Sequence, residues 1–176
     1  LLRALGIDDT RIEIPVRAVQ SEVADDVQQA TGLRYGVINP GAGWPNKQWP
    51  PEKFGAVAAA IQKSRGLPWV AVWGPGEESL ARRVEEASSG STMLAPATSL
   101  EDLMAIVQRA AIVVAGDTGP VHLAAAAGTP VVGLYGPTNP ARNGPWSPRD
   151  VCISRFDRCR CHHKRRCTSA AWCLDT

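Results

Sequence analysis

The length, composition and charge of the chain describe a globular protein of about one domain. Its 176 residues are 44% hydrophobic and 20% charged, the balance of a folded domain with a sizeable core. The formal net charge of +2 excludes a strong overall attraction to nucleic acid or membrane, and no apolar run reaches the roughly 20 residues that cross a bilayer. The first residues lack the apolar stretch and cleavage pattern of a secretory signal. Because the chain starts without Met, we expect it to be a piece of a longer protein.

Helices and strands are predicted to alternate from residue 35 onward. The preceding residues, 1–34, are typical of a connector, with one short helix over 21–31 that begins at the capping residue Ser21. Apolar side chains recur along one face of 51–64, which predicts an amphipathic helix. The other predicted helices cover 77–87, 99–109 and 120–127. The predicted strands cover 35–38, 68–73, 92–94, 111–115 and 130–135.

The regular pattern ends after Gly136. Repeated prolines and glycines predict a long irregular loop, with one short strand near Val151. The remaining residues, 151–176, are rich in Cys and Arg. We therefore expect a connector (1–34), an α/β domain (35–150) and a separate C-terminal segment (151–176).

The predicted strands indicate the fold class. They are rich in Val and Ile without polar alternation, so both of their faces are expected to be buried. Together with the intervening helices this predicts a Rossmann-like, doubly wound parallel sheet. Ligands of such sheets bind at the carboxyl ends of the strands, so the loops that follow the strands are the candidate binding loops.

The most informative of these loops is the turn Asp117-Thr118-Gly119. It joins a buried strand to a helix start, where unpaired N–H groups and the positive end of the helix dipole receive anions. With His122 one turn further on, the loop combines an acid, a hydroxyl and an imidazole, a set that suits a sugar nucleotide better than a bare phosphate. The alternative is structural: Asp117 caps the helix and His122 packs in the core.

Three further loops carry candidate binding residues. Lys47 is either a point charge for a phosphate or a solvated lysine. One of Glu77 and Glu78 is expected to accept ribose hydroxyls while the other serves the following helix dipole, and their order in the loop does not decide between them. Thr98 is a candidate for a nucleobase or ribose contact, and the adjacent Ser99 is expected to be a helix N-cap.

The C-terminal segment holds all five cysteines, at positions 152, 159, 161, 167 and 173. With His162 and His163 these are ligand types for zinc, but the spacing departs from paired C-x-x-C sites. Reduced thiols, a local metal site and a disulfide clip therefore remain open. The basic residues nearby lack the interleaved aromatics of a nucleic-acid surface, so we expect no nucleic-acid partner.

The phrases carrying these residues resemble glycosyltransferase family 9, the heptosyltransferases of lipopolysaccharide core assembly. The matching phrases, in the family's order, are NPGAGWPNKQWPPEKF, VWGPGEE, TSLEDL, GDTGPVHLAAAAGTPVVGLYGPTNP and the C-x-C…C…C tail. The resemblance implies a GT-B fold, of which this chain would be the C-terminal, donor-binding half.

The same resemblance implies roles for individual residues. Lys47 and the Asp117-Thr118-Gly119 turn would hold the donor's diphosphate and sugar, with His122 at the same site. Glu77 or Glu78 would contact the ribose, and Thr98 would lie near the adenine. No catalytic metal, cofactor or catalytic base is expected in this chain; the base would lie in a separate N-terminal domain that binds the acceptor.

The implied reaction is the inverting transfer of a heptose from ADP-heptose to a lipid-linked lipopolysaccharide core acceptor. The implied location is the bacterial cytoplasm, with the whole enzyme able to associate with the inner membrane. A module that binds a nucleotide sugar or another anion without turnover is the alternative.

Overall fold

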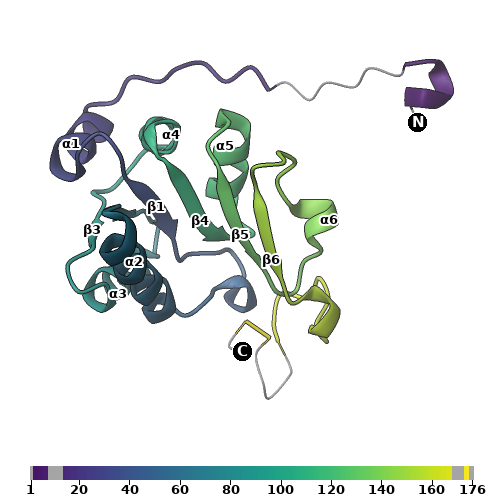
Figure 1. Ribbon diagram of the computed structural model, residues 1–176. Helices are drawn as coiled ribbons and strands as arrows, with labels where there is room; N and C mark the ends of the chain where they lie inside the picture. Colours follow the sequence, from purple (N-terminus) through teal and green to yellow (C-terminus); the bar gives the residue numbers. More distant parts are fainter. Residues whose placement is uncertain (1, 8–13, 168–172, 175–176) are drawn as a thin grey trace.

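A computed structural model describes residues 2–7, 14–167 and 173–174 (Figure 1). Its centre is a six-stranded sheet in the order β3-β2-β1-β4-β5-β6 in which all neighbouring strands are parallel. The strands are β1 Gly36–Asn39, β2 Trp69–Ala71, β3 Thr92–Leu94, β4 Ile112–Gly116, β5 Val131–Tyr135 and β6 Val151–Ser154. This is the strand order of a doubly wound, Rossmann-like sheet, and it confirms the predicted fold class.

Helices cover both faces of this sheet. The α-helices are α1 Glu22–Thr31, α2 Pro51–Arg65, α3 Glu78–Ala87, α4 Leu100–Arg109, α5 Gly119–Ala127 and α6 Pro140–Asn143. Three short 3₁₀ turns are η1 Leu2–Leu5, η2 Pro45–Lys47 and η3 Phe156–Arg158. None of the helices in the described part of the chain has both the length and the apolar character needed to cross a bilayer.

Two hydrophobic clusters form the core, one on each face of the sheet. Val37 belongs to the cluster that includes residues of α1, α4 and α5, whereas its neighbour Ile38 belongs to the one that includes residues of α2 and α3. Val113 and Val114 divide between the clusters in the same way. The alternation occurs because successive side chains of a strand point to opposite faces. Central strands therefore need apolar residues at every position, as the sequence predicted.

Elements outside the predicted α/β domain (35–150) pack against it at both ends. The Ser21 hydroxyl accepts a hydrogen bond from the Ala24 N–H (3.1 Å), which caps α1, and donates one to Asp102 Oδ1 on α4 (2.6 Å). Asp25 of α1 and Arg109 of α4 form an ion pair. At the other end, β6 pairs with β5 along its length. The helix within 1–34 and the strand near Val151 thus both pack on the central sheet.

Two local predictions differ from the structure. The strand predicted over 68–73 is shorter, because regular pairing with β1 and β3 covers only Trp69–Ala71. The loop after Gly136 contains α6, which the sequence analysis did not predict. Its cap is the Asn139 side chain, whose Oδ1 accepts from the Ala141 N–H (2.9 Å), and Pro140 occupies the first turn. Asn-Pro is a helix-start signal, but the surrounding prolines and glycines obscured it.

The strand order determines where a ligand can bind. The order reverses between β1 and β4, because the chain moves outward from β1 to β2 and β3 and then returns to β4 on the other side. The loops after β1 and β4 therefore separate and leave a crevice at the carboxyl edge of the sheet. These are the loops that contain Lys47 and Asp117.

Candidate functional site

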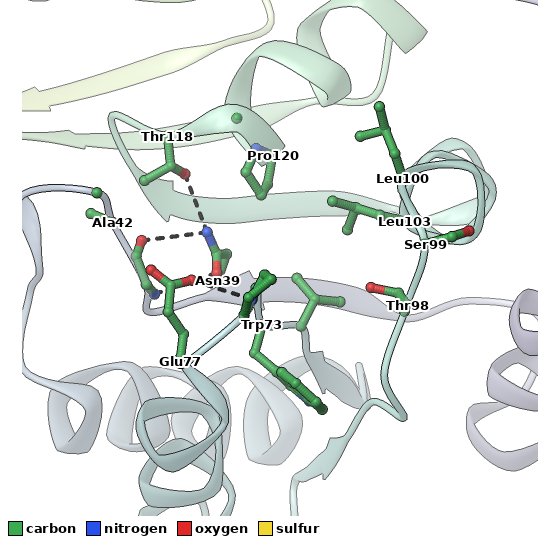
Figure 2. Close-up of a pocket in the computed structure, with 16 residues that line it drawn as sticks. Asn39, Ala42, Trp73, Glu77, Thr98, Ser99, Leu100, Leu103, Thr118 and Pro120 are labelled. Atoms are coloured by element: carbon green, nitrogen blue, oxygen red, sulfur yellow. Dashed lines mark hydrogen bonds between the residues drawn. The ribbon is translucent and has the colours of Figure 1, made fainter.

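A pocket of about 320 Å³ lies in this crevice, between the loops that follow β1, β2, β3 and β4. Figure 2 shows Asn39, Ala42 and Glu77 toward one end, and Leu100 and Leu103 with the loop containing Thr98 toward the other. Of the residues predicted from sequence, Glu77, Thr98, Thr118 and Gly119 line this pocket. The pocket thus has one end rich in polar groups and one end rich in apolar carbon.

The polar end is organised around Asn39, the last residue of β1. Its Nδ2 donates to Thr118 Oγ1 (3.2 Å) and to the Gly41 carbonyl (3.4 Å), and its Oδ1 accepts from the Gly41 N–H (3.3 Å). The Asn39 side chain is buried, so these bonds join the loop after β1 rigidly to the turn after β4. The sequence analysis did not select Asn39. The sequence pattern that could have identified it is an asparagine at the end of a buried strand.

Glu77 and Glu78 lie in different environments. Glu77 is the N-cap residue of α3, and its Oε2 accepts from the Gly74 N–H (3.3 Å), which holds the carboxylate at the pocket. A Cβ added at Gly41 would overlap that carboxylate, so the absence of a side chain at position 41 makes room for it. Glu78 instead forms an exposed i,i+4 ion pair with Arg82. The acid that faces the pocket is therefore Glu77.

Thr98 and Ser99 follow β3 and precede α4. Ser99 caps α4 in a capping box with Asp102: Ser99 Oγ accepts from the Asp102 N–H (3.1 Å), and Asp102 Oδ2 accepts from the Ser99 N–H (3.0 Å). The predicted N-cap is confirmed. This cap leaves Thr98 half-buried at the edge of the pocket, near the apolar side chains of Leu100 and Leu103. Neither leucine was selected from the sequence, because an apolar residue in an amphipathic helix is usually part of the core.

Asp117, Lys47 and His122 form a separate charged cluster beside the pocket. Lys47 Nζ lies 2.7 Å from Asp117 Oδ2, and His122 Nε2 lies 3.6 Å from Oδ1. The Asn143 side chain, from α6, donates a hydrogen bond to the same Oδ2 at 3.1 Å. The side chains of Lys47 and Asp117 are only 13% and 4% exposed, so this is a nearly buried ion pair. Asn143 was not predicted, because α6 itself was not.

The environment keeps Asp117 ionised. Burial by itself would raise the pKa of this carboxyl, but the contacts with His122, Lys47 and Asn143 outweigh burial and hold the pKa well below its usual range. The structural alternative for this turn was that Asp117 caps α5 and that His122 packs in the core, and both parts of it are wrong. The N-cap of α5 is Thr118 rather than Asp117, and the His122 side chain is 49% exposed rather than packed in the core.

The start of α5 is open to a ligand. The Thr118 side chain makes no capping hydrogen bond, so the positive end of the nine-residue helix is not capped by the side chain of its own N-cap residue. Thr118 and Gly119 line the pocket at this point. Close packing at Gly116 positions the Lys47 turn, because a Cβ there would come within 2.8 Å of the Lys47 carbonyl oxygen. The arrangement can place an anion at the helix start with a cation nearby.

Comparison with known proteins assigns this geometry to a family. The model of glycosyltransferase family 9 (heptosyltransferase) matches residues 3–173. The chain belongs to this family. Among curated family 9 relatives, lipopolysaccharide heptosyltransferase 3 of Escherichia coli is 31% identical over 156 residues, which are 84% of this chain and 45% of that protein. The chain therefore spans less than half the length of this relative.

Solved structures agree with that assignment. A glycosyltransferase family 9 structure from Veillonella parvula superposes with a TM-score of 0.73 at 27% identity, over 89% of this chain and 47% of that one. The E. coli heptosyltransferase WaaC with ADP-2-deoxy-2-fluoro heptose superposes with a TM-score of 0.63 at 26% identity, over 86% of this chain and 45% of that one. The predicted fold, a Rossmann-like domain of a GT-B glycosyltransferase, is confirmed.

Two cysteines of this family 9 chain pack against each other. Cys159 and Cys161 are buried with their sulfurs 3.2 Å apart, and burial raises the pKa of the Cys159 thiol. Asn46 of η2 donates to Cys161 Sγ at 3.5 Å, which anchors the segment to the loop after β1. Within residues 2–7, 14–167 and 173–174, no three His, Cys, Asp or Glu side chains are grouped so as to hold a metal ion. Cys159 and Cys161 therefore act in the described structure as small packing residues.

Proposed function

We propose that this chain is the donor-binding domain of a lipopolysaccharide heptosyltransferase and that it binds ADP-heptose. One observation carries the proposal. The pocket at the switch point of the sheet combines an acid, Glu77, with the uncapped start of α5, and the Lys47–Asp117 pair lies beside it. The relatives support this choice of ligand, since one is named for lipopolysaccharide and the structure of another was solved with ADP-2-deoxy-2-fluoro heptose.

The two ends of the pocket suggest the orientation of the nucleotide. Its adenine would lie at the apolar end, against Leu103 and Pro120 and beside Thr98. Glu77, and not Glu78, would accept hydrogen bonds from the ribose hydroxyls, because only Glu77 faces the pocket. This orientation directs the diphosphate toward the start of α5.

The diphosphate and sugar would be held by the turn after β4. Thr118 and Gly119 would bind the diphosphate at the positive end of α5, and Lys47 would add a charge-assisted bond to it. The Asp117 carboxylate would repel phosphates by itself, but its pairing with Lys47 offsets that charge. Asp117 and His122 would therefore contact the sugar, Asp117 as an acceptor for its hydroxyls.

The reaction proposed for the whole enzyme is inverting heptose transfer to a lipid-linked lipopolysaccharide core acceptor. The diphosphate leaving group would be stabilised by Lys47 and the α5 dipole, so the mechanism calls on no metal or other cofactor at this step. The catalytic base and the acceptor site are assigned to a separate N-terminal domain, and 1–34 to the connector that leads from it. The proposed location is the bacterial cytoplasm, at the inner membrane where the acceptor is held.

Calorimetric titration with ADP-heptose, ADP and UDP tests the proposal. Binding of ADP-heptose and ADP, with UDP weaker by tenfold or more, is expected. Glu77→Gln should weaken ADP binding by roughly tenfold, because it removes a charged acceptor worth about 1.5 kcal/mol or more. The matched control is Glu78→Gln, which removes the same charge from the neighbouring residue and should leave the affinity within twofold. Failure of every nucleotide to bind, or equal effects of the two variants, would contradict the proposal.

A further inference from the structure

A patch of exposed cations lies at the same edge of the sheet and has no part in the proposed donor site. Arg160, Lys164, Arg165 and Arg166 are all exposed, and we call these four residues the cationic rim. Residues 158–167 contain no Asp or Glu, so every charged side chain of this segment is positive. Since the whole chain carries a net charge of only +2, the rim concentrates positive charge locally.

The backbone of the rim is held against the two loops that border it. The His163 N–H donates to the Pro137 carbonyl, in the loop after β5, at 2.7 Å. The Asn46 side chain, in η2, donates to the Lys164 carbonyl at 2.8 Å. The His162 ring stacks on Phe156 with 4.4 Å between the ring centroids. The segment after β6 therefore lies next to the turn after β1 at the carboxyl edge of the sheet (Figure 1).

Trp44 connects the rim to the charged cluster of the donor site. Lys47 Nζ lies 4.3 Å from the centroid of the Trp44 ring, and Arg165 Cζ lies 5.9 Å from the same centroid. The Trp44 ring therefore contacts both Lys47, which is proposed to bind the diphosphate, and Arg165 of the rim. A hollow of about 400 Å³, lined by Pro45, Asn46, Arg166 and Cys167, opens beside them. This volume is many times that of one water molecule, so it admits a phosphate group.

The charges of the rim are not neutralised within the described structure. The described ion pairs, such as Lys47–Asp117 and Arg109–Asp25, include no rim residue. Exposed guanidinium groups with no carboxylate partner keep their donors available, and their planar geometry matches a phosphate in a bidentate manner. A second positive surface next to the proposed donor site suits the acceptor, because the acceptor must approach the donor's sugar.

We propose that the cationic rim binds phosphate groups, carried either by the acceptor's saccharide or by the phospholipids around the acceptor, and so holds the acceptor beside the donor pocket. The assignment to the acceptor rests on the proposed function, whereas phosphate binding itself does not. Both sources offer the same chemistry to the rim, and the experiment separates them.

Vesicle co-sedimentation of the chain tests the proposal with three surfaces. The first is phosphatidylcholine alone, which has no net charge. The other two contain phosphatidylcholine with either phosphatidylglycerol or lipid A, a phosphorylated saccharide lipid, and these two are matched in surface charge. We expect the strongest binding to lipid A vesicles. Arg165→Gln combined with Arg166→Gln should weaken it by roughly 30-fold, from the contribution of two cations at an anionic surface. The Arg165→Lys, Arg166→Lys variant should retain most of the binding because it keeps both charges.

The control changes the same net charge at the other end of the molecule. Lys63 and Arg65 are exposed at the C-terminal end of α2, and Lys63→Gln with Arg65→Gln should leave vesicle binding within twofold. Equal binding to lipid A and phosphatidylglycerol would support phosphate binding and assign the phosphates to the phospholipids. No binding to either anionic vesicle, or equal losses in the rim and control variants, would overturn the proposal.

The same variants separate this proposal from the donor site. The rim variants should bind ADP as the unchanged chain does, because no rim residue lines the donor pocket. If the unchanged chain bound lipid A vesicles but not ADP, the proposed function would fail while phosphate binding by the rim would stand. If it bound ADP but no anionic vesicle, the rim proposal alone would fail.

Discussion

Lys47→Met tests the charged cluster most directly. The substitution keeps a long side chain next to Trp44 but removes the ammonium group that lies 2.7 Å from Asp117 Oδ2. The Asp117 side chain is only 4% exposed, so its charge cannot be hydrated after the lysine is lost. The variant should therefore destabilise the fold as well as weaken donor binding.

The size of the effect follows from the partners that remain. Removing one member of a buried ion pair typically costs about 3–5 kcal/mol, because the other charge is left uncompensated. Asn143 still donates to Asp117 at 3.1 Å, and His122 remains at 3.6 Å, so part of that loss is offset. We expect the free energy of unfolding to fall by about 2–3 kcal/mol. Donor affinity should fall roughly 10- to 100-fold if Lys47 makes one charge-assisted bond to the diphosphate.

Urea unfolding at several pH values tests how the stability lost in Lys47→Met depends on pH. The pKa of Asp117 is lowered in the folded chain, so its contribution to stability is complete above its unfolded value of about 4 and is lost as the pH falls below that value. Removing Lys47 raises the folded pKa again, so the difference between Lys47→Met and the unchanged chain should shrink from pH 7 toward pH 3. Adding Asp117→Asn to Lys47→Met should recover at least half of the lost stability, because no buried charge then remains, but it should recover none of the donor affinity.

Two results would refute this reasoning. A stability loss below about 0.5 kcal/mol for Lys47→Met would place the pair among surface ion pairs of little value. A difference that stays constant between pH 7 and pH 3 would show that the Asp117 charge is not what the lysine stabilises.

Three further predictions concern single contacts. Gly41→Ala should weaken ADP binding by tenfold or more, because a Cβ at this position would overlap the Glu77 carboxylate, and an affinity within twofold of the unchanged chain would show that the position of this carboxylate does not matter. Asn143→Ala should lower the free energy of unfolding in urea by about 1–2 kcal/mol, since it removes a hydrogen bond to a charged group. An unchanged urea midpoint would show that α6 does not stabilise the charged cluster around Asp117. Ser21→Ala should cost about 1–2 kcal/mol in the same assay by removing the α1 cap and its bond to α4, and a cost near zero would show that α1 does not depend on them.

Much of the local structure could be predicted because its causes are local. The residues that begin a helix, such as Ser21 and Ser99, make hydrogen bonds within three positions of themselves, so short-range patterns identify them. The α5 start after the Asp117-Thr118-Gly119 turn was placed correctly for the same reason. The miss at α6 has the opposite cause, since a four-residue helix has too few positions to show a period.

The candidate site was predictable only in part. Sequence reasoning brought Glu77, Thr98, Thr118 and Gly119 to one pocket because the carboxyl ends of parallel strands meet at one edge. It did not separate Glu77 from Glu78, since their orientation depends on where α3 begins, and a shift of one residue turns a helical side chain by about 100°. It also missed Asn39, whose role lies in bonds to a residue 79 positions away.

The sequence by itself determined the alternation of strands and helices, the burial of both sheet faces and the family to which the chain belongs. These properties follow from hydrophobic periodicity, capping residues and short motifs, all of which act over a few residues. Only the tertiary structure decided that Asn143 and Lys47 share one oxygen of Asp117, and that Trp44 contacts both Lys47 and Arg165. Those contacts join segments far apart in the chain, and they exist because the order of the strands brings the loops after β1, β4, β5 and β6 to one edge of the sheet.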